Sequence, residues 1–289
     1  MPQNFLILKM VIFKLISILP QWVLYIFSDI LFLIGYYVVG YRKKVILGNL
    51  QYAFPEKTES ERREIARQFF RNLTDSFAEI IKMYRISKED LDKRVKIENK
   101  EIVLDAIKKG QVIIGLTGHF FNWEMHLLQM MANVSNKCDV VYLKVNNPFF
   151  EKLMLAIRTR FGGGLIERSG FQRDYLRKRD QPRLIVLAAD QRPSHGEIRY
   201  WASFMNRETA FFEGAEKLAK RFNHPVMYSH VHKPKRGHYT FTYEMVSIPP
   251  YEKEKEHSIT DAYIALTEKN IREQPSLYLW SHKRWKDSR

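Results

Sequence analysis

A long apolar stretch near the N-terminus constrains this chain more than any other feature of its sequence. Trp22 to Gly40 spans 19 residues with a single charge, close to the ~20 residues that cross a bilayer as a helix. A second apolar run, Phe5 to Leu19, precedes it and carries only Lys9 and Lys14 as charges. Pro20 separates the two runs. We therefore expect an N-terminal hydrophobic segment that associates with a membrane.

Three arrangements of these runs stay open: a spanning anchor, a helical hairpin, and two helices lying on the membrane face. Lys9 and Lys14 suit an interfacial helix, because long cationic side chains can reach the headgroups. The alternative is a buried core helix, although the many aromatic residues of the second run favour membrane contact. The cluster Arg42-Lys43-Lys44 predicts that the rest of the chain lies on the cytoplasmic side. No small-x-small cleavage site follows, so a cleaved signal peptide is not expected.

After residue 44 the sequence alternates between helix and strand patterns. Thr58 and Glu61 form a capping box, and apolar residues then recur at three- and four-residue spacing through Tyr84, which predicts a core-facing helix. Short apolar runs predict strands at 112–116, 140–145, 184–189, 225–231 and 238–246. Further helices are predicted at 122–131, 148–161, 207–221 and 259–271. This order is typical of an α/β fold with a mostly parallel sheet and late antiparallel strands. It divides the chain into a membrane-associating segment, residues 1–44, and an α/β domain, residues 45–289.

The charge balance narrows the class of partner. The chain has 47 Lys and Arg residues against 32 Asp and Glu, a formal net charge of +15. Such a chain favours nucleic acid, anionic lipid, a phosphorylated substrate or an acidic carrier protein. The single cysteine, Cys138, excludes an internal disulfide and a Cys-based zinc cluster, and its apolar neighbours predict that it is buried.

Residues with catalytic chemistry gather where predicted strands end, which is where open α/β sheets bind ligands. Gly118 and His119 follow the strand at 112–116, and Glu124 falls in the first turn of the next helix. A loop histidine can present one ring nitrogen to a substrate hydroxyl while a carboxylate holds the other nitrogen. This arrangement is a general base with an orienting acid. A purely structural histidine, with a glutamate favoured at a helix N-terminus, stays open on spacing alone. Asp190 and Gln191 end the strand at 184–189 and are expected to face the same crevice.

Other types of site fit the sequence less well. There is no G-x-S-x-G elbow for a serine hydrolase, and the glycines at 162–164 lack the Lys-Ser/Thr of a P-loop. His230 and His232 share a predicted strand face, but no carboxylate follows at ligand spacing, so no metal is expected. The basic, Trp-containing C-terminus could bind nucleic acid by charge and stacking. The membrane-like N-terminus does not belong to that interpretation.

Several motifs, in order along the chain, resemble the late lipid A acyltransferases, which are the lauroyl and myristoyl transferases of the glycerolipid acyltransferase type. The run at 119–124, His-Phe-Phe-Asn-Trp-Glu, looks like that family's H-x4-D/E motif. The other similar landmarks are Arg42-Lys43-Lys44, Asn49-Leu50, Phe54-Pro55-Glu56, Asn147-Pro148, Arg158 and Arg160 with Gly162-Gly163, Asp190-Gln191, Phe211, Gly214-Ala215, Leu218-Ala219, Pro225-Val226 and the run from Tyr278 to Trp285. Phe121 departs from the family's usual glycine, and residues 204–209 lack its Gly-rich form.

The resemblance implies a glycerolipid-acyltransferase-like αβα sandwich with an N-terminal membrane-associating helix. It implies acyl transfer from an acyl carrier protein thioester to a hydroxyl of a lipid A precursor, at the cytoplasmic face of the inner membrane. His119 would remove the hydroxyl proton and Glu124 would orient and charge it. The implied substrate-binding residues are Asn147, Arg158, Arg160, Asp190, Gln191, Lys283 and Arg284. Of the two arginines near the glycines, we expect Arg160 to reach the site, because the neighbouring glycines permit close backbone approach.

The resemblance calls for no metal, no redox cofactor and no nucleic-acid partner; the thioester of the carrier protein is a co-substrate. Two alternatives stay open. One is an acyltransferase of the same family that acts on another glycolipid or on an aminoacyl lipid. The other is a non-catalytic membrane-surface binding protein in which the His119–Glu124 pair is structural.

Overall fold

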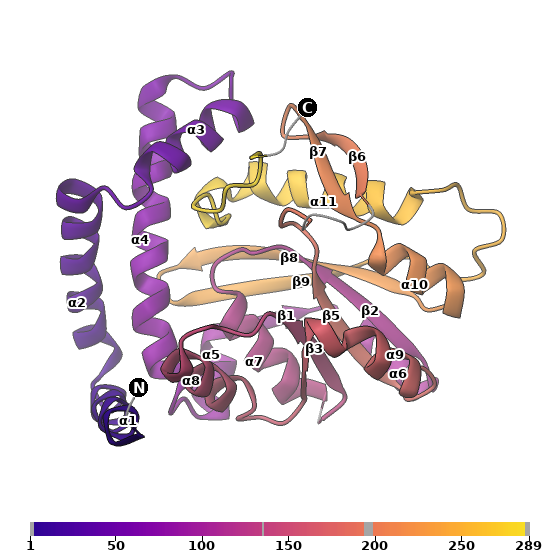
Figure 1. The fold of residues 1–289 in the computed structure, drawn as a ribbon, viewed down its shortest axis with the longest axis horizontal. Coiled ribbons are helices and arrows are strands. Elements are labelled where there is room, and N and C mark those ends of the chain that lie inside the picture. The colour runs from indigo at the N-terminus through magenta and orange to yellow at the C-terminus, as the bar shows by residue number, and fades with distance from the viewer. Residues whose placement is uncertain (1–2, 135, 194–198, 287–289) are drawn as a thin grey trace.

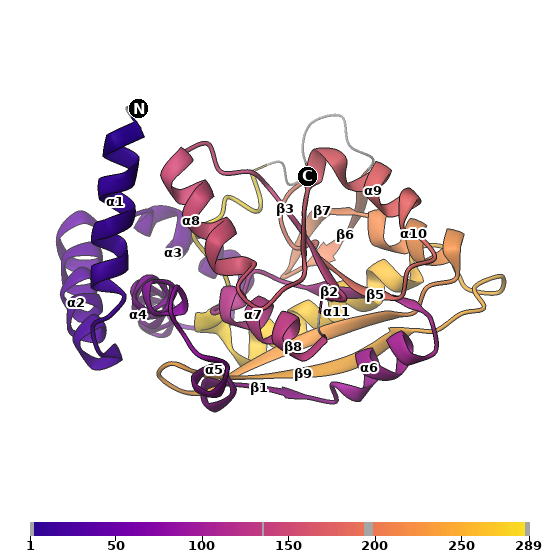
Figure 2. The same cartoon turned by 90° about the horizontal axis from the view of Figure 1, so that it is seen from below.

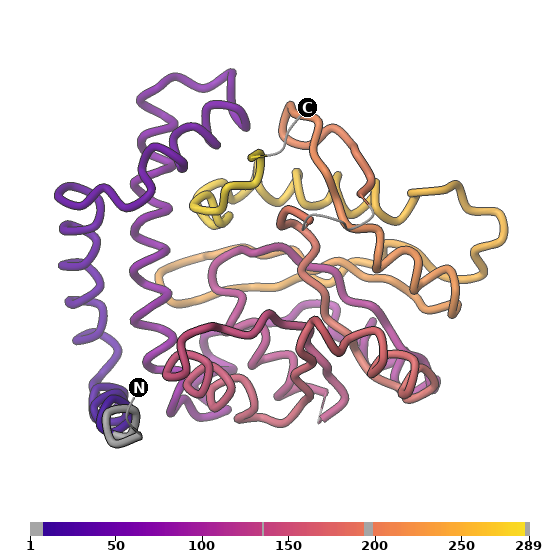
Figure 3. Tube along the Cα trace, in the orientation of Figure 1, coloured from indigo at the N-terminus to yellow at the C-terminus, as the bar shows by residue number. Residues whose placement is uncertain are grey.

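The computed structural model describes residues 3–134, 136–193 and 199–286, with side chains from residue 8 onward (Figure 3). Seven strands form the central sheet in the order β1-β9-β8-β2-β5-β3-β4 (Figure 1). Their bounds are β1 Val95–Glu98, β2 Val112–Thr117, β3 Cys138–Tyr142, β4 Gly164–Glu167, β5 Arg183–Ala188, β8 Val226–Lys235 and β9 His238–Ser247. Neighbouring strands are parallel except β8 and β9, which form an antiparallel hairpin. The predicted mostly parallel sheet with late antiparallel strands is confirmed.

Helices cover both faces of this sheet (Figure 2). α6 (Glu101–Lys108) and α7 (Trp123–Val134) bury apolar residues with Leu184 and Val186 of β5. α9 (Phe171–Arg177) packs on the opposite face, where Tyr175 meets Ile185, together with α10 (Gly214–Phe222) and α11 (Ser258–Glu273). Successive residues of β5 therefore serve opposite layers, as the two-residue period of a strand requires. The αβα sandwich is confirmed.

The remaining helices lie at one side and one end of the sandwich. They are α1 (Gln3–Ile16), α2 (Gln21–Leu33), the π-helical η1 (Ile34–Val39), α3 (Lys43–Ala53), α4 (Glu59–Met83), α5 (Lys88–Arg94), α8 (Pro148–Arg158) and the short 3₁₀ turns η2 (Arg168–Gly170) and η3 (Pro275–Leu277). The capping box of Thr58 and Glu61 begins α4 as predicted. Its apolar stripe is only partly buried: Ile65 and Phe69 are enclosed, whereas Phe77 is 51% exposed.

The N-terminal apolar runs form two helices that cross. Figures 1 and 2 show α1 end-on in one view and side-on in the other, while α2 does the reverse. The hairpin alternative is therefore wrong. One face of α2 packs against α4 through Leu24, Ser28 and Phe32, whereas Trp22 on the outer face is 66% exposed. Residues 21–39 are long and apolar enough to cross a membrane, yet only 22% of them are buried, so the core-helix alternative is also wrong.

One predicted helix begins too early. The expected helix at 207–221 is in fact strand β7 (Arg207–Phe212) followed by α10, and β7 pairs antiparallel with β6 (Arg199–Phe204) in a separate two-stranded sheet. Met205 and Asn206 connect them with φ of 49° and 64°, the left-handed pair that a tight hairpin turn needs. The pairing partner lies outside the local pattern, so periodicity alone could not reveal the strand. Other predicted bounds differ by up to four residues.

Candidate functional site

The register of two neighbouring strands brings His119 and Asp190 together. β2 and β5 are parallel, with Thr117 opposite Ala188, and each of the two site residues comes two positions after its strand ends. The His119 backbone N–H donates to Asp190 Oδ2 at 3.0 Å, and its ring Nδ1 lies 2.6 Å from Asp190 Oδ1. A Cβ at Gly118 would lie 2.6 Å from the ring of Phe120, which explains the glycine before the histidine. The expectation that Asp190 faces the same crevice as His119 matches this geometry.

The surroundings of His119 and Asp190 determine which ring nitrogen of the imidazole carries the proton. The Asp190 side chain is 2% exposed and the His119 side chain 24% exposed. Burial lowers the pKa of His119. The charge and hydrogen bond of Asp190, together with the charge of Glu124, oppose this effect, and the resulting pKa of His119 is above its ordinary value. Burial raises the pKa of Asp190, but His119 lowers it below the usual range. An ionised Asp190 keeps the proton on Nδ1 and leaves Nε2 to accept one.

Glu124 does not occupy the position predicted for it. Its Oε2 accepts from Arg158 Nε at 2.9 Å, and its Oε1 accepts from Arg158 Nη2 at 2.5 Å and from the Trp123 indole at 3.0 Å. Within the part of the chain that the structure describes, no hydrogen bond joins it to His119. The carboxylate on the ring is that of Asp190, because the end of β5 lies beside the end of β2, where Ala188 is opposite Thr117. Glu124 acts on His119 through charge, which raises the pKa of the imidazole less than Asp190 does.

The arginine that reaches the site is Arg158, and the expectation for Arg160 is wrong. Arg158 forms a two-pronged ion pair with Glu124, and its side chain is 17% exposed. Arg160 instead donates to the carbonyls of Met83 and Ile86, at 3.1 Å and 2.7 Å. Its guanidinium therefore holds the connection between α4 and α5. The two residues point apart, as residues two positions apart at a helix end do.

The other predicted binding residues occupy varied positions. Asn147 is exposed and caps α8, accepting from the backbone N–H groups of Phe149 and Phe150. Gln191 is half-buried and Lys283 is exposed. Arg284 is buried, donates to the carbonyl of Ala210 at 2.7 Å and lies 4.6 Å from the centre of the Phe211 ring. The substrate-binding roles of these residues stay predictions.

Arg284 also borders a small cationic pocket beyond the end of β5. Arg192, Arg199 and Arg284 line it, with Trp285 and one carboxylate, Glu208. The charge of Arg284 contributes to the lowered pKa of Asp190, so the pocket and the His119–Asp190 pair share an electrostatic environment. Three guanidinium groups and one carboxylate around one pocket give this edge of the sheet a positive potential.

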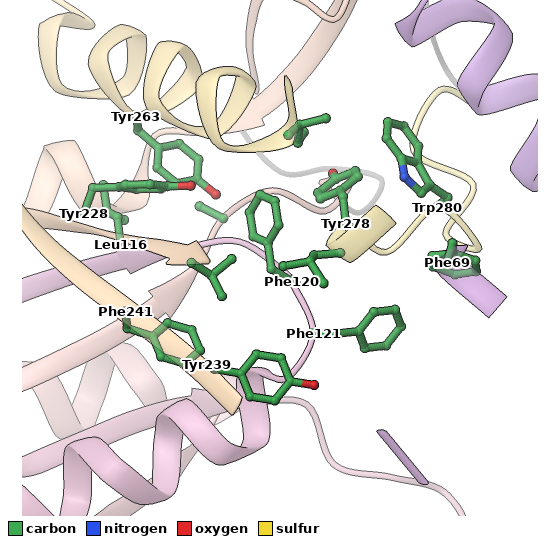
Figure 4. Close-up of a cluster of buried hydrophobic side chains, with 14 of the residues drawn as sticks. Phe69, Leu116, Phe120, Phe121, Tyr228, Tyr239, Phe241, Tyr263, Tyr278 and Trp280 are labelled. Carbon is green, nitrogen blue, oxygen red and sulfur yellow. The ribbon is translucent and has the colours of Figure 1, made fainter. Parts of the chain in front are cut away.

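The C-terminal segment holds the loop that carries His119. The Leu279 N–H donates to the His119 carbonyl at 3.0 Å, and the Phe121 N–H donates to the Leu277 carbonyl at 2.9 Å. Figure 4 shows Phe120 beside Tyr278, with ring centres 5.3 Å apart, and Phe121 on the side of Phe69. The run from Tyr278 to Trp285 therefore has a structural role next to the site.

Sequence reasoning missed two sets of residues around this loop. The first is the backbone of residues 277–279, whose hydrogen bonds to the loop no sequence motif indicates. The second is a polar stripe on α4, in which the carboxyl side chains of Asp75 and Glu79 are buried. Two carboxylates four apart beside an apolar helix stripe were the available signal. Within the described ranges, no group of three His, Cys, Asp or Glu side chains could hold a metal ion.

Comparison with known proteins identifies the family. The sequence profile of the bacterial lipid A biosynthesis acyltransferases matches residues 1–287. A lipid A biosynthesis myristoyltransferase of Escherichia coli (strain K12) is 25% identical over 167 residues, and so is a lipid A biosynthesis acyltransferase 1 of Shigella flexneri. Each match covers 56% of this chain and 51% of the relative, so the chain spans about half the length of the curated relatives it matches. With a match over nearly its whole length, this chain belongs to the bacterial lipid A biosynthesis acyltransferase family.

Proposed function

We propose that this protein transfers a fatty acyl group from an acyl carrier protein thioester to a hydroxyl of a lipid A precursor, with His119 as general base. One observation carries the proposal: Asp190 holds Nδ1 of His119 at 2.6 Å while part of the ring stays exposed. Among the described residues this is a base and orienting-acid pair at a loop where two parallel strands end, the usual ligand position in such sheets.

The proposed reaction needs no covalent enzyme intermediate. Nε2 of His119 takes the proton of the acceptor hydroxyl as that oxygen attacks the thioester carbonyl, and the charge of Asp190 stabilises the imidazolium that forms. The C–S bond then breaks, the new ester remains on the acceptor, and the departing thiolate takes the proton from Nε2. Every atom of the two substrates appears in the ester and the thiol.

The positive charge of the protein supports the two proposed substrates, an acceptor with phosphate groups and an acidic carrier protein. The pocket of Arg192, Arg199 and Arg284 lies beyond Asp190, so phosphate groups of the acceptor would meet positive charge close to the base, whereas the charge of Arg158 is balanced by Glu124. The net charge of +15 favours approach of an acidic carrier protein.

The apolar N-terminal surface supports work at the cytoplasmic face of the inner membrane. Large apolar side chains of α1, α2 and η1 are exposed, from Ile16 at 38% to Val38 at 80%. An apolar surface of this kind on a folded protein marks an interaction site. Arg42-Lys43-Lys44 follows directly and suits anionic headgroups on the cytoplasmic side. We favour helices lying on the membrane face over a spanning anchor, because α2 is docked along α4.

The test is a transfer assay with the purified protein. Acyl chains of several lengths on acyl carrier protein, and the same chains on coenzyme A, are offered with a panel of acceptors: a lipid A precursor, another glycolipid and an aminoacyl lipid. Mass spectrometry of the products identifies the acceptor and the new ester. We expect transfer from the carrier protein to the lipid A precursor.

His119→Ala serves as the inactive variant and His232→Ala as its control, since His232 is exposed on β8. We expect His119→Ala to retain less than about a hundredth of the activity, the minimum contribution of a general base. Transfer only to another acceptor would support the same-family alternative. No transfer to any acceptor, with membrane binding intact, would support a non-catalytic membrane-surface protein.

A further inference from the structure

A buried carboxylate outside the two ion pairs of the site joins three parts of the fold. Glu79 of α4 is 2% exposed. Its oxygens accept hydrogen bonds from the Tyr25 hydroxyl at 3.0 Å, from Asn122 Nδ2 at 2.7 Å and from the Tyr239 hydroxyl at 3.0 Å. These donors belong to α2, to the loop that carries His119 and to β9. Glu79 thus connects an N-terminal helix to the catalytic loop through one side chain.

The hydrogen bond from Asn122 connects Glu79 directly to the loop that carries His119. Asn122 Oδ1 accepts from the backbone N–H groups of Glu124 at 3.1 Å and Met125 at 3.3 Å. Asn122 therefore caps the start of α7, where an amide oxygen satisfies N–H groups that have no partner in the helix. Because Glu79 binds the amide nitrogen, it dictates which way that amide faces. The helix turn that carries Glu124 is held by this arrangement.

The hydrogen bond from Tyr25 connects Glu79 to α2, the helix that also carries exposed apolar side chains. The Tyr25 hydroxyl meets Glu79 on the docked face of α2, and one turn away the Ser28 hydroxyl donates to Asp75 of α4 at 2.7 Å. On the outer face of the same helix Trp22 and Phe27 are exposed by 66% and 53%. The helix with the exposed apolar face is therefore also the helix whose tyrosine supports the catalytic loop.

We propose that Glu79 is a positioning residue that ties the docking of α2 to the geometry of the loop from His119 to Glu124. The proposal rests on the acyltransferase function proposed above. It makes α2 a part of the catalytic body as well as a membrane contact. Loss of the Tyr25–Glu79 bond therefore lowers turnover even when the protein binds membranes and substrate normally.

The first experiment compares Tyr25→Phe with Ser28→Ala. Both remove one hydroxyl bond between α2 and α4, but only Tyr25 leads through Glu79 to the loop. With acceptor dispersed in detergent micelles, we expect Tyr25→Phe to lower kcat by about three- to tenfold, the effect of one lost hydrogen bond. KM and binding to anionic lipid vesicles stay within about twofold. Ser28→Ala should match the wild type in kcat.

Glu79→Ala and Glu79→Gln form a second pair. Burial raises the pKa of Glu79, which the charge of Lys233 and the bond from Asn122 oppose, and a neutral glutamine can still accept from Asn122. Glu79→Ala should lower kcat at least tenfold, since small misplacement of a catalytic group is costly. Glu79→Gln should restore most of that loss. If Glu79→Ala does not fold, the Tyr25→Phe comparison decides.

A third readout does not depend on activity. Hydrogen exchange of the backbone amides of Glu124 and Met125 should be faster in Tyr25→Phe than in Ser28→Ala or the wild type. Equal exchange in both variants, together with equal kcat, would overturn the positioning role. An inactive wild type whose exchange still responds to Tyr25→Phe would refute the proposed function and leave the Glu79 connection standing.

Discussion

Replacing Asp190 by Asn tests which carboxylate serves the histidine. Asn keeps the shape and one acceptor for Nδ1, but it removes the charge that stabilises the imidazolium and the acceptor for the His119 backbone N–H. The two atoms lie 2.6 Å apart, so the charge centres are roughly 4 Å apart and attract by about 4 kcal/mol at an effective dielectric constant of ~20. With a tenfold change in rate for each ~1.4 kcal/mol, Asp190→Asn should lower kcat about 10³-fold and change KM little.

The same substitution should change the pH profile in a defined direction. A base must be neutral, so kcat/KM of the wild type falls as pH drops through the pKa of His119, which Asp190 raises above 6.5. In Asp190→Asn burial is left to lower that pKa, so the acid limb should move to lower pH. Glu124→Gln should move it less, because its charge is the smaller cause. Initial rates between pH 5 and 9, measured with carrier-bound acyl donor, give both parameters.

Asp139→Asn is the matched control. Asp139 is also a largely buried aspartate of the sheet, 7% exposed, and pairs with Arg183 at 3.0 Å. Asp139→Asn should therefore lower stability but leave the acid limb in place. The reasoning fails if Asp190→Asn keeps more than about a tenth of the wild-type kcat, far above the loss that the Coulomb estimate demands, or if its acid limb moves to higher pH.

The remaining predictions concern stability and membrane binding. Arg158→Met should lower the free energy of unfolding in urea by about 3 kcal/mol, because Glu124 is left buried and unpaired; replacing both by Met should recover much of this. Burial lowers the pKa of His126 from 6.5 to about 3. The folded protein therefore excludes a proton that the unfolded chain binds, and His126 should contribute about 2 kcal/mol to the loss of stability between pH 7.5 and pH 5; urea titrations should find the loss smaller by this amount in His126→Asn. Changing exposed Trp22 and Ile26 to Ser should weaken vesicle co-sedimentation at least tenfold with an unchanged urea midpoint, and a change in the midpoint alone would contradict it.

Much of the architecture could be predicted because it depends on local patterns. The capping box at Thr58, the apolar stripe that follows it and the short apolar strands each satisfy hydrogen-bonding or burial requirements within a few residues. The strand before His119 and the strand before Asp190 were predictable in the same way. Their common position at one sheet edge followed from the general behaviour of parallel sheets.

The N-terminal helices were harder to predict because their partner is distant in sequence. The apolar content of residues 22–40 indicated a membrane or a core. It did not indicate that Ser28 and Tyr25 would meet buried carboxylates of α4 about 50 positions later. The prediction for residues 207–212 failed for the same reason, since the backbone of β7 pairs with β6 and not with its own neighbours in sequence.

The sequence by itself determined the histidine that we propose as the base, the glycine that precedes it and the two strands whose ends carry the site. Only the tertiary structure decided which side chains meet. The one-to-one pairing of β2 with β5 set Asp190 against His119, and the end of α8 brought Arg158 to Glu124. The physical reason is that spacing along a chain limits what a side chain can reach, whereas strand register and helix packing select the partner within that reach, and a buried charge is stable only where such a partner is supplied.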